Sequence, residues 1–266
     1  MDEDSDDLGY CIYTAPCGYF DDRINEFQTI SINPPSYSDL LRNITSLKKL
    51  QMIQDLYLSE LFLKFDYFLS RGYRRSGNLL YNNVCEECSR CIPIRIPVKD
   101  FVMTKRYRRI LRNNSDIEIR AVKPEITDEK IKLFQKYNAL RHDHNNDCLE
   151  HLSSLHYGYD GIYEMDYFLD NKLIAVGILD LGDDSSSSNY FYFDPQYSKR
   201  SLGVFSVLKE IEFTQQSGRI FYYLGFYIEE SEKMRYKSQY QPAQVRIDNK
   251  WVDFDKTKLT VYKSSN

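Results

Sequence analysis

The sequence predicts an α+β protein with a mainly antiparallel sheet. Apolar residues recur at helical spacing over residues 47–69, and two short apolar stretches meet at Asp170 and Asn171, a hairpin signature. A chain of 266 residues with 42% hydrophobic and 28% charged residues can bury one large core or two modest ones. We expect a disordered acidic tail at residues 1–8, a cysteine-cluster domain at 9–115 and a second α+β domain at 116–266.

The formal net charge of −4 is dominated by the first seven residues, which contain five acids (Asp2, Glu3, Asp4, Asp6 and Asp7). Removing these five raises the charge from −4 to +1. The net charge therefore does not predict a nucleic-acid partner, and only local basic patches can indicate one. The sequence has no apolar run long enough to span a bilayer and no export leader. We therefore expect a cytoplasmic protein with no membrane and no DNA partner.

In the first half, residues 11–16 read as a short strand that ends at Pro16, and residues 33–46 read as a connection. A helix follows over residues 47–69, and Gly72 lies just beyond its end, where glycine is the usual residue. Residues 92–97 read as another strand.

Three cysteines, Cys85, Cys88 and Cys91, form two overlapping C-x-x-C steps. Such spacing is typical of metal ligands, and a tetrahedral site needs a fourth thiolate. Cys17 is the favoured fourth ligand and Cys11 the alternative. Zinc and an iron–sulfur cluster both suit four thiolates, and free thiols are a third interpretation. Six cysteines in a reducing compartment argue against a disulfide framework.

Residues 104–113 predict a helix with one basic face. At about 100° per residue the apolar side chains fall on the opposite side, and within residues 104–113 no acid lies four residues from the cations. A phosphate backbone is a natural counter-charge for such a face, although an ordinary solvated helix face is the alternative interpretation. The basic face consists of Lys105, Arg108, Arg109 and Arg112.

In the second half, we expect a strand at 117–122, a helix at 127–141 and a polar, histidine-containing loop at 143–157. We expect the side chains of His144, His151 and His156 to be exposed to solvent. Strands at 161–169 and 173–181 form a hairpin, and residues 183–189 form a serine-rich flexible loop. A strand at 190–193, a helix at 201–216, a strand at 220–224 and a hairpin turned at Asp248 and Asn249 complete the chain.

An ordered series of motifs resembles the bacterial aminoacyl-tRNA-protein transferases, relatives of the eukaryotic arginyl-tRNA-protein transferases. The series extends from Cys17 to Trp251, so the resemblance covers nearly the whole chain. The matching motifs are Cys17-x-Tyr19, the run from Gly72 to Gly77, the run from Cys85 to Pro97, Arg141-His142, Asp166-Tyr167-Phe168, Arg200-Ser201-Leu202-Gly203, Tyr223-Leu224-Gly225 and Lys233-Met234-x-Tyr236-Lys237.

The resemblance implies an acyltransferase fold of the N-acetyltransferase-like (GNAT) type at residues 116–266. It also implies an activity: transfer of leucine from leucyl-tRNA to the N-terminal Asp or Glu of acceptor proteins, which marks them for degradation in an N-degron pathway. Arginyl transfer to the same termini is the alternative, because the donor pocket cannot be located from the sequence. The arginyl relatives are associated with an iron–sulfur cluster, but their cysteine spacing differs. The resemblance therefore does not determine which metal the four cysteines would bind.

The same motifs imply site residues. Tyr236 and Lys237 are expected to relay a proton to the leaving 3′ oxygen, with Asp166 orienting a partner. An oxyanion site is expected at a backbone N–H of a sheet bulge, and no cofactor is needed for the transfer itself. Arg74, Arg75, Arg141 and His142 are expected to bind the acidic N-terminus. The cations expected to contact tRNA, besides the basic face, are Lys199, Arg200 and Lys233.

Two other classes of function compete with this interpretation. A non-catalytic, metal-containing RNA-binding protein would explain the cysteines and the basic helix, but not the long second half. An acetyl-CoA-dependent acetyltransferase would need a glycine-rich turn at residues 199–203 to cradle a diphosphate. That turn holds a single glycine, Gly203, beside Lys199 and Arg200, which suits the phosphates of a tRNA acceptor end better.

Overall fold

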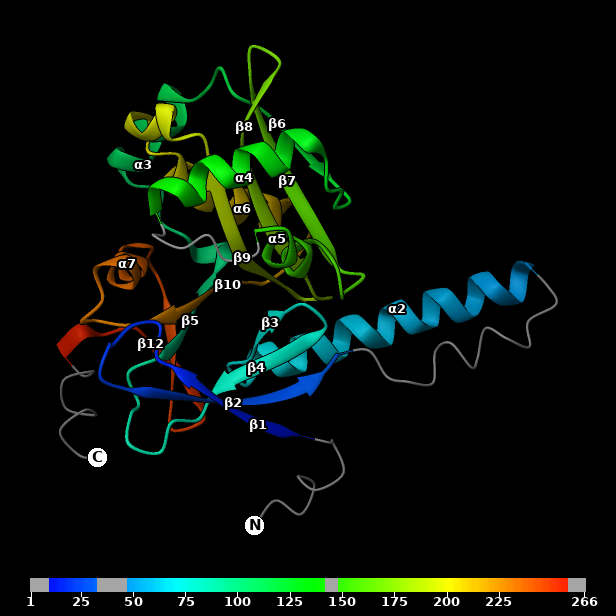
Figure 1. Ribbon diagram of the computed structural model, residues 1–266, viewed down its shortest axis with the longest axis vertical. Coiled ribbons are helices and arrows are strands. Elements are labelled where there is room, and N and C mark those ends of the chain that lie inside the picture. The colour runs from blue at the N-terminus through cyan, green and yellow to red at the C-terminus, as the bar shows by residue number, and fades with distance from the viewer. Residues whose placement is uncertain (1–9, 33–46, 142–147, 258–266) are drawn as a thin grey trace.

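The computed structural model describes residues 10–32, 47–141 and 148–257 and has an α+β architecture (Figure 1). Within these residues the main sheet has eight strands in the spatial order β12-β11-β5-β10-β9-β8-β7-β6. Its strands are β5 (Ile92–Pro97), β6 (Glu118–Val122), β7 (Ile162–Leu169), β8 (Lys172–Leu181), β9 (Ser185–Phe193), β10 (Phe221–Tyr227), β11 (Gln244–Ile247) and β12 (Lys250–Asp253).

Strands β6 to β9 form an antiparallel series, and helix α6 then crosses over to β10, which is parallel to β9. The remaining pairs, β10 with β5, β5 with β11 and β11 with β12, are antiparallel. This order confirms the predicted mainly antiparallel, GNAT-like fold. The helices are α2 (Leu47–Ser70), α3 (Lys105–Asn113), α4 (Asp128–Arg141), α5 (Cys148–His156), α6 (Leu202–Gln216) and α7 (Glu232–Arg235), with 3₁₀ turns η1 (Val98–Asp100), η2 (Pro195–Arg200) and η3 (Tyr236–Gln239).

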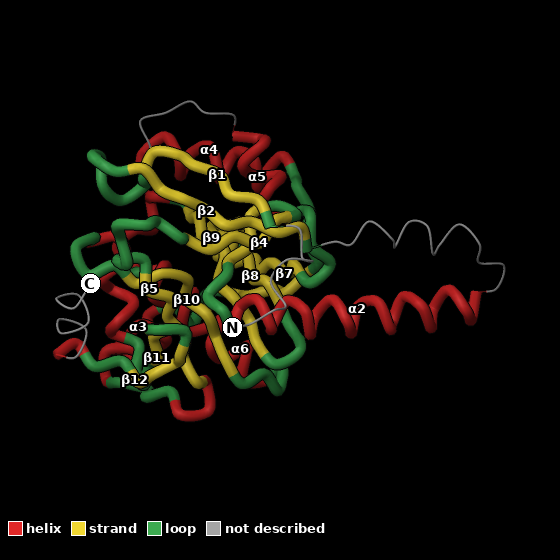
Figure 2. The backbone as a smooth tube through the Cα atoms, turned by 90° about the horizontal axis from the view of Figure 1, so that it is seen from below, coloured by secondary structure: helices red, strands yellow, loops and turns green. Residues whose placement is uncertain are grey.

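A second, four-stranded antiparallel sheet lies beside the main one, in the order β1-β2-β4-β3. Helix α2 follows β2 in the chain and projects beyond the rest of the molecule in both views (Figures 1 and 2). The strands of this small sheet are β1 (Cys11–Pro16), β2 (Ile24–Ser31), β3 (Arg74–Ser76) and β4 (Leu79–Asn83).

The two faces of the main sheet bury separate apolar cores. One core contains Tyr107 and Ile110 of α3 together with Phe205, Leu208 and Ile211 of α6. The other joins α2, α4, α5 and the small sheet to the opposite face. In Figure 1, α4 and α5 accordingly lie in front of the main sheet and α6 behind it. The small sheet is therefore held against the α5 side, and this packing creates the cavity described below.

Most predicted elements are confirmed. Helix α2 buries Leu61, Phe65 and Phe68, and helix α3 buries Tyr107 and Ile110 while its basic side is exposed. Both hairpins turn where expected, with positive φ at Asp170 and Asn171 and at the two residues of the second turn, Asp248 and Asn249. Asparagine and aspartate tolerate this conformation, which explains the signature.

Two predicted loops are wrong. Helix α5 lies inside the predicted loop at 143–157, because Leu152 and Leu155 lie three residues apart and pack into the core. The predicted flexible loop at 183–189 contains the start of β9, where Ser186 and Ser187 pair with both β8 and β10 and Ser185 pairs with β10. A run of four serines reads as a loop by composition, but small side chains fit well in a strand that is covered on both faces.

The predicted domain boundary at residues 115 and 116 divides elements that share one sheet. Strand β5 pairs with β10 and β11, and helix α3 packs against α6. The division into two folding units stays a prediction. The acidic tail and the connection at 33–46 lie outside the described residues.

Candidate active site

A cavity of about 670 Å³, which we call the Arg74 pocket, lies between the small sheet and the α5 side of the main sheet. All four strands of the small sheet contribute side chains, and α5, β9 and β10 close it. The residues lining the pocket are Tyr13, Gly18, Tyr19, Asn25, Phe27, Thr29, Arg74, Arg75, Ser76, Leu79, Tyr81, Asn83, His151, Ser154, Leu155, Asn189, Tyr190 and Phe226. The lining includes no carboxylate, and its polar groups are amides, hydroxyls, a histidine and two arginines.

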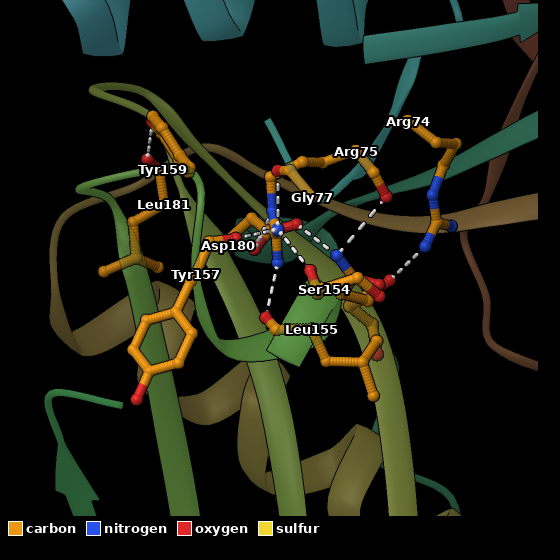
Figure 3. Close-up of polar contacts among 11 residues, drawn as sticks. Arg74, Arg75, Gly77, Ser154, Leu155, Tyr157, Tyr159, Asp180 and Leu181 are labelled. Atoms are coloured by element: carbon orange, nitrogen blue, oxygen red, sulfur yellow. Dashed lines mark hydrogen bonds and ion pairs between the residues drawn. The ribbon is translucent and has the colours of Figure 1, made fainter. Parts of the chain in front are cut away.

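Arg74 and Arg75 are consecutive residues of β3, so their side chains point to opposite faces of the strand. Figure 3 shows the Arg75 guanidinium enclosed by protein oxygens. Its Nε pairs with Asp180 Oδ1 at 2.9 Å, and both side chains are buried. Its Nη atoms donate to four carbonyls, those of Gly77, Ser154, Leu155 and Tyr157. These donors are therefore occupied within the fold.

Arg74 has a different environment. Its Nη2 donates to the Ser188 carbonyl at 2.6 Å, and its buried Nε has no partner among the described residues. No described carboxylate forms an ion pair with it. The structure therefore leaves Arg74, and not Arg75, with a charge and donors to offer a ligand.

Gly225 of β10 explains how the Arg74 guanidinium reaches this position. A Cβ on Gly225 would lie 1.6 Å from Arg74 Nη1, and the φ of Gly225 is +83°. Both facts require glycine. The strand is also irregular here: its pairing with β5 shifts register between Tyr223 and Gly225, which leaves Leu224 as an extra residue. This is the type of sheet bulge at which an oxyanion-binding N–H is expected.

The main sheet opens beside Arg74. Strands β9 and β10 are paired only from Ser185 to Ser187 and from Phe221 to Tyr223. Ser188, whose carbonyl binds Arg74, is the first residue of β9 beyond this pairing. We call the opening the β9/β10 split. Arg74 therefore lies at the point where the two strands separate.

Tyr236 and Lys237 lie close enough to Arg74 for its charge to act on both groups. Lys237 is 7% exposed and donates to the Phe226 carbonyl at 2.9 Å. Burial, followed by the charge of Arg74, lowers the pKa of its amine well below the usual value. Loss of solvent around the phenol raises the pKa of Tyr236, and the Glu210 carboxyl raises it further. The amine and the phenol are therefore two groups near Arg74 that can each donate or accept a proton.

Asp166 lies elsewhere, in a buried charged cluster on β7. Its Oδ2 pairs with Lys130 Nζ of α4 at 3.0 Å, and the same ammonium pairs with Glu164. His156 Nε2 lies 3.1 Å from Glu164 Oε2, and its Nδ1 lies 2.8 Å from the Leu152 carbonyl. Both ring nitrogens therefore face acceptor oxygens, and the ring is held between α5 and β7. The expectation that His156 is solvated is wrong, because the sequence pattern did not reveal α5.

No hydrogen bond or ion pair joins Asp166 to Tyr236 or Lys237 in the part of the chain that the structure describes. The cluster instead ties β7 to α4 and α5. Hydrogen bonds from His156 and Lys130 lower the pKa of Glu164 against the effect of burial, whereas burial and the Glu164 charge raise the pKa of Asp166. The catalytic role of Asp166 stays a prediction without a contact to support it.

The four predicted metal ligands gather near the pocket. Burial, followed by the charges that Cys88, Cys17 and Cys85 would carry as thiolates, raises the pKa of the Cys91 thiol to about 12. Cys85 is engaged by protein groups: its Sγ donates to Asn25 Oδ1 at 3.0 Å. Among the described residues no three Cys, His, Asp or Glu side chains form a metal-ligand set. No step of the reaction is assigned to a metal, and zinc or an iron–sulfur cluster at these four cysteines stays a prediction.

The predicted tRNA contacts are mostly exposed cations. Lys105, Arg108, Arg109 and Arg112 are exposed on α3, and none forms an ion pair with a described acid. Lys199 and Lys233 are also exposed. Arg200 differs, because its Nη1 and Nη2 both bind Asp116, each at 2.9 Å. The side chain of Arg141, together with His142 and His144, lies outside what the structure describes.

Comparisons with known proteins agree with the motifs. Family models described as "Arginine-tRNA-protein transferase, N terminus" and "Arginine-tRNA-protein transferase, C terminus" match residues 15–109 and 129–247. A Saccharophagus degradans protein called aspartate/glutamate leucyltransferase is 34% identical over 245 residues, which cover 90% of this chain and 93% of that protein. A Hahella chejuensis protein of the same name is 31% identical and covers 91% and 95%.

Among solved structures, the crystal structure of FemX covers 96% of this chain and 90% of that chain, at a TM-score of 0.47 and 9% identity. No helix of the described residues is apolar and long enough to cross a bilayer.

Proposed function

The chain belongs to the arginine-tRNA-protein transferase family, and we propose that it transfers leucine from leucyl-tRNA to the N-terminal Asp or Glu of acceptor proteins. The enzyme is an aminoacyltransferase with an aminoacyl-tRNA donor and a protein acceptor. The name shared by the curated relatives supports leucine as the donated residue. A leucine added to such an N-terminus would mark the acceptor for degradation. Because aminoacyl-tRNA is a cytoplasmic reactant, the reaction is proposed to take place in the cytoplasm.

The Arg74 pocket is the proposed binding site for the N-terminus of the acceptor protein. It has no carboxylate in its lining, and Arg74 has no acidic partner among the described residues. A half-buried cation without a counter-charge favours an anionic ligand, and a guanidinium fork matches a carboxylate. We therefore assign Arg74 to the side-chain carboxylate of the acceptor Asp or Glu. Arg75 is left out of this assignment because its donors are used by Asp180 and the carbonyls around it.

The chemistry requires little activation. The ester of aminoacyl-tRNA is reactive, and an α-amine with a pKa near ~8 is roughly one-tenth neutral at pH 7. Holding the amine and the ester in one pocket lowers the activation free energy by several kcal/mol, at best by roughly 7 or more. In the proposed mechanism Tyr236 protonates the leaving 3′ oxygen, and Lys237 is the second group of the proton relay. The Leu224 N–H at the β10 bulge is the proposed donor to the oxyanion.

The basic face of α3 is proposed to bind the phosphate backbone of the tRNA, with Lys199 and Lys233 as further contacts. Thr104 accepts a hydrogen bond from the Tyr107 amide and fixes the start of the helix, and Tyr107 and Ile110 anchor its other side. The four cations are consequently held outward on a rigid element. Zinc or an iron–sulfur cluster at Cys17, Cys85, Cys88 and Cys91 is retained as a proposal about structure, not about the transfer step.

Alanine at Arg108 and Arg112 is expected to weaken tRNA binding without changing the acceptor KM. Each lost phosphate contact should reduce the slope of log K against log salt by about 1. Binding of aminoacyl-tRNA would be measured at several salt concentrations. Lys132→Ala on α4, an exposed cation on the other side of the main sheet, serves as the control and should leave the slope unchanged. An unchanged slope in the Arg108 and Arg112 variants would remove α3 from the tRNA site.

A peptide mass-shift assay tests the function as a whole. The full chain is given leucyl-tRNA or arginyl-tRNA, with peptides that begin with Asp, Glu, Asn or Ala. We expect a leucine-sized increase on the Asp and Glu peptides only. An arginine-sized increase would favour the alternative donor that the family description suggests. No increase with either donor would overturn the proposal.

A further inference from the structure

Three arginines lie where the hairpin of β11 and β12 meets the end of α2, and the reaction described above gives them no role. They are Arg71, just beyond α2, Arg95 of β5 and Arg246 of β11, and we call them the Arg71 cluster. None of the three forms an ion pair with a carboxylate of the described residues. By contrast, Arg75 and Arg200 each pair directly with an acid. Because like charges without a counter-charge repel one another, an anion would bind favourably here.

Contacts between the hairpin and the end of α2 bring Arg71 and Arg246 together. Trp251 Nε1 of β12 donates to the Ser70 carbonyl at 2.7 Å. A Cβ on Gly72 would lie 3.6 Å from Arg246 Cδ. Arg246 and Trp251 are cross-strand partners in the hairpin. Since Arg71 lies between Ser70 and Gly72 in the chain, its backbone is held beside both hairpin side chains.

The guanidiniums of Arg71 and Arg246 have donors that the fold leaves unused. Arg246 is partly buried, and its buried Nε has no hydrogen-bond partner in the described part of the chain. Burial, followed by the charge of Arg71, lowers the pKa of the Arg246 guanidinium, although arginine stays protonated at neutral pH. Arg71 is exposed, and its side chain forms no hydrogen bond or ion pair with a described residue. Two such guanidiniums offer fork-shaped donors that match a phosphate.

Arg95 adds a third positive charge, which neutral groups hold in place. Its Nε donates to Gln244 Oε1 at 3.0 Å and its Nη1 to Tyr223 OH at 3.1 Å. The guanidinium carbon lies 4.3 Å from the centroid of the Trp251 ring. Asp253, the last residue of β12, accepts from Gln244 Nε2 and not from Arg95. These contacts fix the cation without neutralising its charge.

Aromatic rings alternate with the cations of the Arg71 cluster. The guanidinium carbon of Arg71 lies 3.8 Å from the centroid of the Tyr67 ring, and that of Arg95 lies 3.7 Å from the centroid of Phe221. Tyr67 is 44% exposed and Arg71 is also exposed, so this stacked pair is accessible to a ligand. Unpaired RNA stacks its bases on arginine planes and aromatic rings while its phosphates contact cations. The combination of residues therefore favours an RNA strand over a small free anion.

We propose that the Arg71 cluster binds an unpaired segment of RNA, with a phosphate between Arg71 and Arg246 and a base stacked on the Arg71 guanidinium. This inference rests on the proposed function, in which the RNA is tRNA. Contacts with Tyr223 and Trp251 place the cluster on the α5 side of the main sheet, where the Arg74 pocket also lies, whereas α3 packs on the opposite side. The cluster is therefore a second RNA contact, separate from the basic face of α3.

The test measures binding of deacylated tRNA at several salt concentrations by wild type and by the double variant Arg71→Gln with Arg246→Gln. We expect the slope of log K against log salt to fall in magnitude by about 0.7, the value for one phosphate of a single strand. In the transfer assay the KM for leucyl-tRNA should rise about 10-fold, with kcat and the acceptor KM nearly unchanged. The control is Arg120→Gln with Lys132→Gln, which removes two exposed cations on β6 and α4 and should leave the slope unchanged.

Arg71→Lys tests the stacked base. Lysine keeps the positive charge but has no plane on which a base can stack. The salt slope should therefore stay as in wild type, while the affinity for tRNA falls about 5-fold. An affinity equal to that of wild type would overturn the stacking contact.

The outcomes separate this inference from the function itself. If wild type transfers neither leucine nor arginine, the proposed function fails, and the salt slope still reports on the Arg71 cluster. If wild type transfers leucine and the glutamine double variant keeps the wild-type slope, the RNA contact is overturned. A raised acceptor KM with an unchanged slope would also overturn it, because the cluster would then bind the acceptor protein. Arg71 is exposed, so Arg71→Gln alone decides the matter if the change at Arg246 prevents folding.

Discussion

Replacing Arg74 by glutamine is expected to lower kcat/KM for Asp- and Glu-initiated peptides by about 10²- to 10³-fold. Removing one partner of a desolvated charge pair costs about 2–5 kcal/mol, and the carboxylate of the acceptor would be left in a pocket without a cation. Activity would be measured with peptides that begin with Asp, Glu and Asn. The loss should be largest for the two acids, so that the variant discriminates poorly between Asp and Asn.

Two further variants sharpen this test. Gly225→Ala should reproduce much of the loss without touching the arginine, because its Cβ would occupy the place of Arg74 Nη1 and the residue has a positive φ. Arg120→Gln is the control: Arg120 is also on a strand, but it lies on β6 and pairs with Glu118. The acceptor assignment would be abandoned if Arg74→Gln retained wild-type preference for acidic peptides.

Replacing Arg75 by methionine is expected to destabilise the protein by about 3–5 kcal/mol. In the variant the buried Asp180 carboxylate loses its ion pair, and four carbonyls lose the hydrogen-bond donor that Arg75 supplies. Three of those carbonyls, from Ser154, Leu155 and Tyr157, belong to the end of α5 and the residue after it, so this helix should loosen first. Urea unfolding would measure the change in the free energy of unfolding.

A second arginine pair provides a matched control. Arg200 binds Asp116 with two hydrogen bonds of 2.9 Å, but its side chain is 29% exposed and that of Asp116 is 51% exposed. Such a pair contributes about 0–1 kcal/mol, so Arg200→Met should change stability little. Equal losses in the two variants would show that burial is not what distinguishes Arg75.

The contrast between Arg74 and Arg75 shows how much of the site the sequence could reveal. Two adjacent arginines in one motif gave the same expectation for both, because the motif does not record what faces each side chain. Side chains alternate between the two faces of a strand. The Arg75 guanidinium therefore contacts Asp180 and the end of α5, whereas the Arg74 guanidinium lies at the β9/β10 split. Asp166 and His156 illustrate the same limit, since their partners Lys130 and Glu164 come from other elements.

Local patterns were sufficient wherever one segment carried its own signal. The two Asp-Asn hairpin turns, the apolar stripe of α2 and the basic face of α3 were predicted correctly, because turn geometry and helical periodicity depend only on neighbouring residues. The ordered motifs also identified the family, because their residues and sequence order are properties of the chain alone.

Only the tertiary structure decided which of these residues share a site. The Arg74 pocket combines strands of the small sheet with α5, β9 and β10. Burial and pairing are set by packing between segments that are more than a hundred residues apart, such as Arg75 with Asp180. The sequence by itself therefore determined the family, most of the elements and the candidate residues. Packing decided which of them can meet a substrate, because the free energy of a charge depends on the partners and the solvent around it.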